Sequence, residues 1–98
     1  MNIKALMKQA QKMQKDMTVA KEEIDKTEYE GKSSFVNVKI NGKKEILNVK
    51  IDAEKIEADE IEMLEDMIMV AMNDAVNKAD VDKEKRLGKY SQGLTGLM

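Results

Sequence analysis

Several residue types that support catalysis or metal binding are missing from this chain of 98 residues. It contains no cysteine, histidine, proline or tryptophan, and its only aromatic residues are Tyr29, Phe35 and Tyr90. Cysteine and histidine are common nucleophiles, general bases and metal ligands, and no Gly-x-Ser-x-Gly elbow or phosphate-cradling glycine loop takes their place. We therefore expect a protein that is not an enzyme and that needs no cofactor and no small-molecule substrate.

Membrane segments and metal loops are also missing. No segment approaches 18 consecutive apolar residues, the first residues lack the apolar region of a secretion signal, and the absence of cysteine fits a reducing compartment. These features favour a cytoplasmic protein without a membrane partner. The stretch from Asp52 to Asp66 holds eight carboxylates and one lysine, but no calcium loop with a central glycine. Acidic residues at the start of a helix complement its dipole, so we expect no metal site.

Residues 2–26 contain no glycine or proline and are predicted to form one long helix. Apolar residues recur along it with the alternating spacing of three and four that is typical of a coiled coil. This apolar seam comprises Ile3, Leu6, Ala10, Met13, Met17, Ala20 and Ile24. Four lysines fall within about 80° of one another on the opposite side. This lysine stripe comprises Lys4, Lys8, Lys12 and Lys15, and no acidic residue occurs among residues 1–15.

The lysine stripe has two interpretations: a solvated helix face, or a site for a polyanion such as DNA. A rigid row of ammonium groups displaces the counterions condensed on a duplex, and lysine favours contacts to phosphates over reading of bases. A second basic cluster, Lys83, Lys85, Arg86 and Lys89, either complements a helix dipole or adds to the same site if the two helices pack antiparallel. The net charge of −2 argues against a generally basic DNA-coating protein.

The middle of the chain is predicted to contain three β-strands, the last two of which form a hairpin. Residues 27–31 form a short strand, and residues 34–40 and 47–51 alternate apolar and polar residues around Asn41-Gly42, a strong signal for a two-residue hairpin turn. Such a turn pairs Val36 with Leu47. Six apolar residues then share one sheet face, with Phe35 and Ile46 as exceptions on the other: Val36, Val38, Ile40, Leu47, Val49 and Ile51.

The rest of the chain is predicted to be helical. We expect a short helical turn at residues 53–57, and then a long helix that Asp59 and Glu62 open as a capping box. This helix ends near Gly88, its middle part at residues 68–72 is buried on several sides, and residues 87–98 form a flexible tail. The fold class is thus α+β, with one domain over residues 1–98. So small a core with a long apolar seam favours a homo-oligomer.

Several strings, taken in order, closely resemble the YbaB/EbfC family of bacterial nucleoid-associated proteins. They are Met7 to Gln14 in the first helix, Ile51-Asp52 after the sheet, Met63 to Asp66 and Asn73 to Ala75 in the long helix, and a glycine-punctuated tail from Gly88 to Met98. The resemblance covers nearly the whole chain. It implies a three-stranded antiparallel sheet flanked by helices, in a homodimer shaped like tweezers. Its helical arms are expected to bind duplex DNA and to change its conformation in the cytoplasm, on the nucleoid.

The resemblance places Lys8 and Lys12 on a DNA-contacting arm, whereas Lys4 and Lys15 join them from the charge pattern alone. We therefore predict DNA contacts, mainly to phosphates, from the lysine stripe and from the cluster Lys83, Lys85, Arg86 and Lys89. Nucleoid organisation and gene regulation follow as functions. The alternative from a different class is a dimeric adaptor that binds another protein through the apolar seam and the methionine-rich surface.

Overall fold

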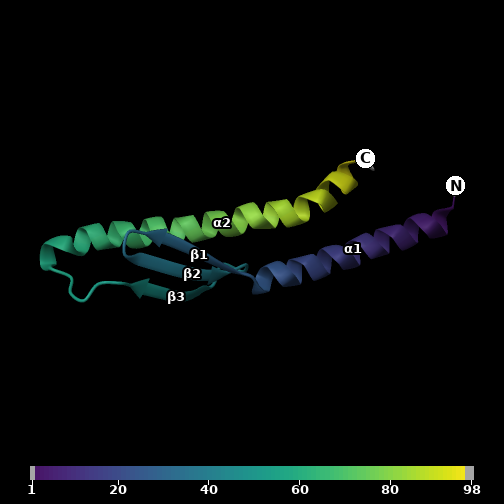
Figure 1. Ribbon diagram of the computed structural model, residues 1–98. Coiled ribbons are helices and arrows are strands. Elements are labelled where there is room, and N and C mark those ends of the chain that lie inside the picture. Colours follow the sequence, from purple (N-terminus) through teal and green to yellow (C-terminus); the bar gives the residue numbers. More distant parts are fainter. Residues whose placement is uncertain (1, 97–98) are drawn as a thin grey trace.

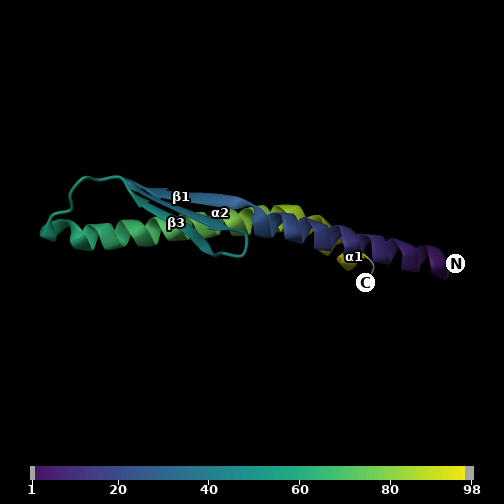
Figure 2. The ribbon, with the colours of Figure 1, turned by 90° about the horizontal axis from the view of Figure 1, so that it is seen from below.

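The chain folds into an elongated α+β structure in which two long helices flank a small sheet. The computed structural model describes residues 2–96, and its extents are 71 × 21 × 13 Å. The elements follow in the order α1 (Ile3–Lys26), β1 (Glu28–Ser33), β2 (Val36–Asn41), β3 (Ile46–Ile51), the 3₁₀ turn η1 (Ala58–Glu60) and α2 (Ile61–Gly96). The predicted fold class is confirmed, and Figures 1 and 2 show that the sheet occupies one half of the molecule.

Helix α1 has the predicted extent, and local hydrogen bonds define both of its ends. The Asn2 side chain caps the start by accepting a hydrogen bond from the backbone N–H of Ala5 at 3.3 Å. At the other end, the backbone N–H of Thr27 donates to the carbonyl of Ile24 at 3.0 Å. Thr27 itself is extended, which directs the chain from the helix into β1.

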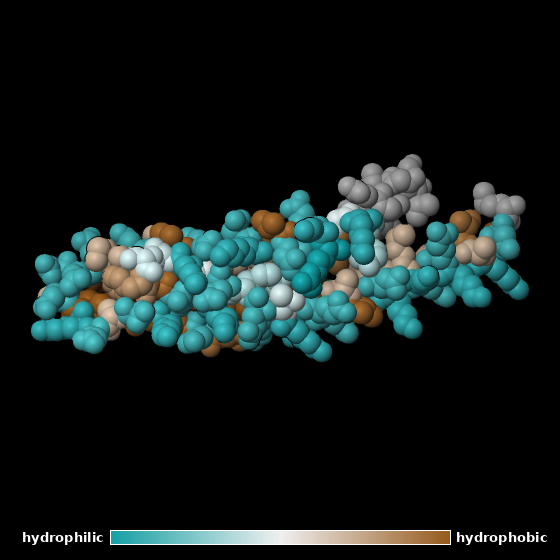
Figure 3. Space-filling model, in the orientation of Figure 1, coloured by the Kyte–Doolittle hydropathy of each residue, from teal (hydrophilic) through white to brown (hydrophobic). Residues whose placement is uncertain are grey.

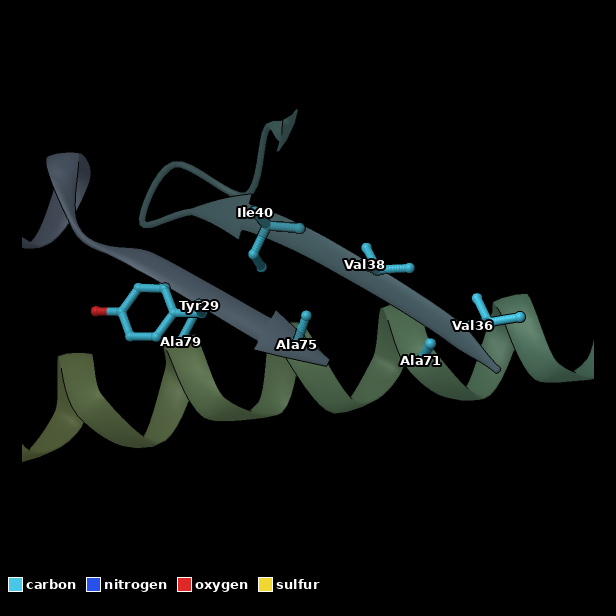
Figure 4. Close-up of a cluster of buried hydrophobic side chains, with 7 residues drawn as sticks. All are labelled: Tyr29, Val36, Val38, Ile40, Ala71, Ala75 and Ala79. Carbon is cyan, nitrogen blue, oxygen red and sulfur yellow. The ribbon is translucent and has the colours of Figure 1, made fainter. Parts of the chain in front are cut away.

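The sheet is antiparallel with the strand order β1-β2-β3, and α2 lies across β1 and β2 without contacting β3. Alternate residues of β2 point toward the helix, and Val36 and Val38 are 0% exposed. Figure 4 shows these side chains facing a row of small residues on α2. The buried cluster comprises Tyr29, Val36, Val38, Ile40, Ala71, Ala75 and Ala79.

The close contact between β1 and α2 depends on small residues on both sides. A Cβ atom added to Gly31 would lie 2.0 Å from the carbonyl oxygen of Ala71 and 2.5 Å from the backbone nitrogen of Ala75. Both atoms belong to the backbone, so a larger residue at position 31 would push the strand away from the helix. The φ angle of Gly31 is not positive, so a special backbone conformation does not explain this glycine. It is required because the strand and the helix approach each other closely.

The predicted hairpin register is wrong. Val36 pairs with Ile51 and Val38 with Val49, and a bulge follows between Lys39 and Ile40. The turn is wider than two residues because the Asn41 side chain accepts hydrogen bonds from the backbone N–H groups of Lys43 (2.9 Å) and Glu45 (3.0 Å). Lys44, with φ of 66°, adopts the left-handed conformation instead of Gly42.

Gly42 has a different role from the predicted one. A Cβ atom at this position would lie 1.9 Å from the carbonyl oxygen of Ile24, at the end of α1. The glycine therefore lets the β2–β3 loop approach the helix. It does not supply a positive φ.

The predicted start and end of the long helix also need correction. Residues 53–57 form no helical turn, and the capping box uses Glu57 and Glu60 in place of Asp59 and Glu62. Helix α2 continues through Gly88 to Gly96 because glycine weakens a helix without ending it. The flexibility of residues 87–98 stays a prediction, and residues 97–98 lie outside the described part of the chain.

The apolar residues of β3 and of the middle of α2 are more exposed in the single chain than predicted. Val49 shares the face of Val38, as expected, yet it is 44% exposed because α2 does not reach β3. On α2, Ala71 is buried, but Met69 and Val70 are 56% and 51% exposed. Figure 3 shows apolar side chains at the surface of the half of the molecule that holds the sheet. Apolar residues are thus exposed both on β3 and on α2.

The two edges of the sheet differ in their hydrogen bonding. On the β1 edge, the backbone N–H of Lys32 donates to the Asp74 carboxylate at 3.1 Å, and the Lys78 ammonium donates to the carbonyl of Glu30 at 2.9 Å. The first of these bonds lowers the pKa of Asp74. Among the side chains described for residues 61–90 of α2, none provides such a bond to β3. The β1 edge is therefore blocked, and the β3 edge is open.

Candidate nucleic-acid interface

Helix α1 and the second half of α2 run antiparallel and extend away from the sheet as two arms. Figure 1 shows both termini at this end of the molecule. Ile24 is buried where the arms begin, and Met13, Met17 and Ala20 are half-buried farther along α1. The apolar seam therefore packs against α2 of the same chain over this length. Nearer the end of the arm, Ile3 is 67% exposed.

All four residues of the lysine stripe are exposed on α1, as the helical period predicts. No ion pair occupies any of them within the described residues. Lys4 and Lys8 lie nearest the end of the arm, while Lys12 and Lys15 lie beside α2. The stripe is thus a row of free positive charges that begins at the arm's end and reaches the space between the helices.

A groove of about 420 Å³ separates the two arms and brings the two predicted basic clusters together. Lys15 lines it from α1, and Lys85, Arg86 and Lys89 line it from α2. Asp16 and Glu23 also line the groove, so cations outnumber carboxylates by four to two. The antiparallel arrangement that places both clusters at one end of the molecule is confirmed. Lys83 does not line the groove.

A second groove lies closer to the end of the arm, and both grooves are lined by Tyr90, an aromatic residue that the charge pattern does not indicate. Lys12 and Gln9 line this groove from α1, and Lys89 and Tyr90 line it from α2. The Lys89 ammonium lies 5.1 Å from the centre of the Tyr90 ring, within the range of a cation–π contact. The only sequence signal for Tyr90 is an aromatic residue next to a lysine, in a segment predicted to be a tail.

Arg86 differs from the lysines around it because its guanidinium group already has partners. Its Nε lies 3.1 Å from one Asp82 carboxylate oxygen and 3.2 Å from the other. Its Nη1 donates to the Thr27 hydroxyl at 3.4 Å. Arg86 therefore adds little free positive charge to the groove.

The opposite end of the molecule is acidic. Figure 1 shows η1 and the start of α2 at the end farthest from both termini. The acidic stretch from Asp52 to Asp66 lies in this region. A polyanion is therefore attracted to the arms and repelled from the far end of the sheet.

The described residues were also compared with the requirements of a metal site and of a membrane-spanning helix. Residues 2–96 contain no cluster of three or more acidic side chains arranged to hold a metal ion. Within the same range, no helix has the length and apolar character needed to cross a membrane.

The fold and the grooves together define an α+β protein with a paired basic arm. Comparison with known proteins assigns its family: residues 1–94 match the model of the YbaB/EbfC DNA-binding family. Nucleoid-associated proteins with similar sequences occur in Ligilactobacillus salivarius (37% identity, 99% of this chain and 95% of the relative) and Lactococcus lactis subsp. cremoris strain MG1363 (40%; 96% and 97%). One from Ruminiclostridium cellulolyticum is 41% identical over 98% of this chain and 85% of its own length. The chain belongs to the YbaB/EbfC DNA-binding family, as the sequence strings predicted.

Proposed function

We propose that this protein is a nucleoid-associated protein that binds duplex DNA mainly through phosphates and changes the conformation of the DNA. The observation that carries the proposal is the meeting of two basic clusters on a pair of adjacent arms. Lys12 and Lys15 face Lys85 and Lys89 across grooves that hold few carboxylates. Lys4 and Lys8 extend the charge toward the end of α1, and Lys83 adds a charge outside the groove. Family membership and the names of the relatives support the same function.

The contacts are proposed to be largely independent of base sequence. Lysine provides a point charge on a flexible stem, so it binds phosphates without the planar geometry that recognises a base edge. The lysine stripes of two subunits contain eight lysines. If these eight each neutralise one phosphate, the affinity falls by roughly four decades between about 50 and 200 mM salt. A role in nucleoid organisation and gene regulation follows from such binding in the cytoplasm.

Fluorescence anisotropy of a labelled duplex at several salt concentrations tests the DNA site. The Lys8→Glu/Lys12→Glu variant is expected to lose most of its affinity and about half of its salt dependence, because it reverses charges on the arm. The Lys43→Glu/Lys50→Glu variant changes the net charge equally on the sheet half and is the matched control. It is expected to retain more affinity than the arm variant. Equal losses in both variants would contradict an arm site.

The same titration separates DNA binding from the adaptor alternative. Salt-dependent binding by the wild type supports the proposal, whereas absent or salt-independent binding would favour an adaptor that uses the apolar seam and the methionines. Ligase-mediated cyclisation of a short duplex tests the conformational effect. Bound protein is expected to change the yield of circles, and an unchanged yield at saturation would restrict the function to binding alone.

We also propose that the protein is a homodimer and that a second copy covers the apolar surface beside β3. Leu47 and Val49 are 48% and 44% exposed on the face that α2 leaves open. The β1 edge is blocked by Asp74 and Lys78, so the open side of the sheet is the one available for another copy. Burying this surface in a self-complementary interface completes the small core.

Light scattering of two variants of β3 tests this interface. Val49→Glu places a charge on the apolar face and is expected to give monomers. Asn48→Glu adds the same charge to the opposite face of the same strand and is expected to remain dimeric. A monomeric wild type would contradict the dimer, and a dimeric Val49→Glu variant would exclude this face as the interface.

A further inference from the structure

A polar network joins the two arms where they leave the sheet. The Tyr29 hydroxyl donates to a carboxylate oxygen of Asp82 at 2.5 Å, and the same carboxylate accepts from Arg86 Nε. Arg86 Nη1 reaches the hydroxyl of Thr27, which in turn donates to the carbonyl of Glu23 at 2.7 Å. The network thus connects the last turn of α1, the start of β1 and the side of α2.

This network lies at the inner end of the groove between the arms. Arg86 is both a member of the network and part of the groove wall beside Lys85. Ile24 is the only fully buried one among the described residues of α1, and Met13, Met17 and Ala20 are half-buried beside α2. The polar bridge from Thr27 to Asp82 adds hydrogen bonds of defined direction to these partial apolar contacts.

We propose that Asp82 and Arg86 are positioning residues that fix the angle between the arms, and with it the spacing of the lysines that contact DNA. This inference rests on the proposed DNA-binding function. Arg86 acts here through Thr27 and Asp82 and does not itself bind a phosphate, because the Asp82 carboxylate compensates its charge. The phosphate contacts come from Lys12, Lys15 and the neighbouring lysines.

The chemistry of the side chains suits this role. A guanidinium group directs several N–H donors from one rigid plane, so Arg86 can hold a carboxylate and a hydroxyl at the same time. A lysine ammonium at position 86 lacks this planar geometry. With its ordinary pKa of 10.0 the Tyr29 hydroxyl is already a donor at physiological pH, and burial, followed by the bond to Asp82, raises this pKa further.

The Asp82→Asn variant distinguishes a positioning role from a simple effect of net charge, because the two predict opposite changes in DNA affinity. Removal of a carboxylate from the groove region would strengthen DNA binding if only net charge mattered. If Asp82 positions the arms, the Kd rises about tenfold, as expected for the loss of one or two well-placed phosphate contacts. Glu84→Gln removes the same charge from an exposed position on α2 outside the network and is the control. It is expected to bind as tightly as the wild type or slightly more tightly.

Arg86→Lys and Arg86→Gln form a second pair. Lysine keeps the charge, so it would restore near wild-type affinity if Arg86 bound a phosphate. The positioning role predicts that both variants weaken binding by a similar factor. Rescue by lysine, or an unchanged or tighter Asp82→Asn variant, would overturn the inference. If the wild type shows no salt-dependent binding to DNA, the proposed function itself is contradicted.

A distance measurement tests the arm angle without DNA. The chain contains no cysteine, so spin labels attach only at cysteines introduced by Gln11→Cys on α1 and Glu84→Cys on α2. Labelled chains are diluted with unlabelled ones to isolate distances within one subunit. Asp82→Asn is expected to broaden or shift the distance distribution while the circular dichroism spectrum retains its helical signal. An unchanged distribution would overturn the inference, and Tyr29→Phe provides a milder variant if Asp82→Asn does not fold.

Discussion

The sheet half and the arm half of this molecule have different physical characters. In the sheet half, β2 and α2 bury valines completely against a row of alanines, and Gly31 permits backbone contact. In the arm half, α1 has 24 residues, yet among those described it buries only Ile24. The comparison teaches that tight packing holds the fold at one end and leaves the charged side chains at the other end free for a partner.

The largest expected effect concerns the packing of the sheet half. Gly31→Ala places a methyl group 2.0 Å from a backbone oxygen of α2, so the strand and the helix must separate. We expect a loss of about 3 kcal/mol or more in the free energy of unfolding, as for severe overpacking. Guanidinium denaturation followed by circular dichroism measures this loss. A variant with wild-type stability would show that β1 and α2 are not in close contact.

An intermediate effect concerns the junction between the halves. Tyr29→Phe removes a hydrogen bond to a carboxylate, and we expect a loss of about 1–2 kcal/mol in the free energy of unfolding at neutral pH. The folded-state pKa of Tyr29 is raised above its ordinary value of 10.0. The stabilisation by the hydroxyl is therefore complete below about pH 10 and is lost as the pH rises through the folded-state pKa.

Denaturation of the wild type and of Tyr29→Phe between pH 7 and 11 measures this dependence. Deprotonation of the lysines affects both proteins and cancels in the difference between them. We expect the difference to decrease above pH 10. If the difference in free energy of unfolding between the two proteins stays constant over the whole range, folding does not raise the pKa of Tyr29.

The smallest expected effect concerns the arm half. Gly88 lies within α2, and no atom lies within 4 Å of a Cβ atom added to it. Gly88→Ala is therefore expected to stabilise the helix locally by about 0.5–1 kcal/mol. Amide hydrogen exchange at Leu87 and Lys89 is expected to slow by about two- to fivefold. Faster exchange would indicate a contact that the alanine disrupts. Replacement of glycine by alanine is thus expected to destabilise the sheet half at position 31 and to stabilise the arm half at position 88.

The sequence predicts the elements of this fold better than their pairing. A regular apolar period and the absence of glycine and proline place α1 correctly, and alternation identifies β2 and β3. The register depends on the turn, and there Asn41 side-chain bonds and the bulge outweigh the preference of Asn-Gly for a two-residue turn. The role of Gly42 depends on Ile24, which only the folded structure brings near.

The candidate site likewise has one part that local sequence predicts and one part that depends on contacts between distant residues. Helical period alone predicts the exposed lysine stripe, since it depends on residues within one helix. The network does not follow from any local pattern, because Tyr29 and Asp82 are 53 positions apart in the chain. The sequence assigns Arg86 to DNA binding for its charge, whereas its contacts support a role in positioning.

Helix α2 is one continuous helix that belongs to both halves of the molecule. It covers the sheet with the turns around Ala71, Ala75 and Ala79 and forms one arm with its last turns, without a break across 36 residues. At 1.5 Å per residue, the part beyond Asp82 is about 20 Å long, so a tilt of about 10° at the network displaces its end by about 4 Å. That displacement is comparable to the rise of about 3.4 Å along the helix axis between neighbouring phosphates of one DNA strand. A small rearrangement near the sheet is therefore sufficient to move an arm by about one phosphate.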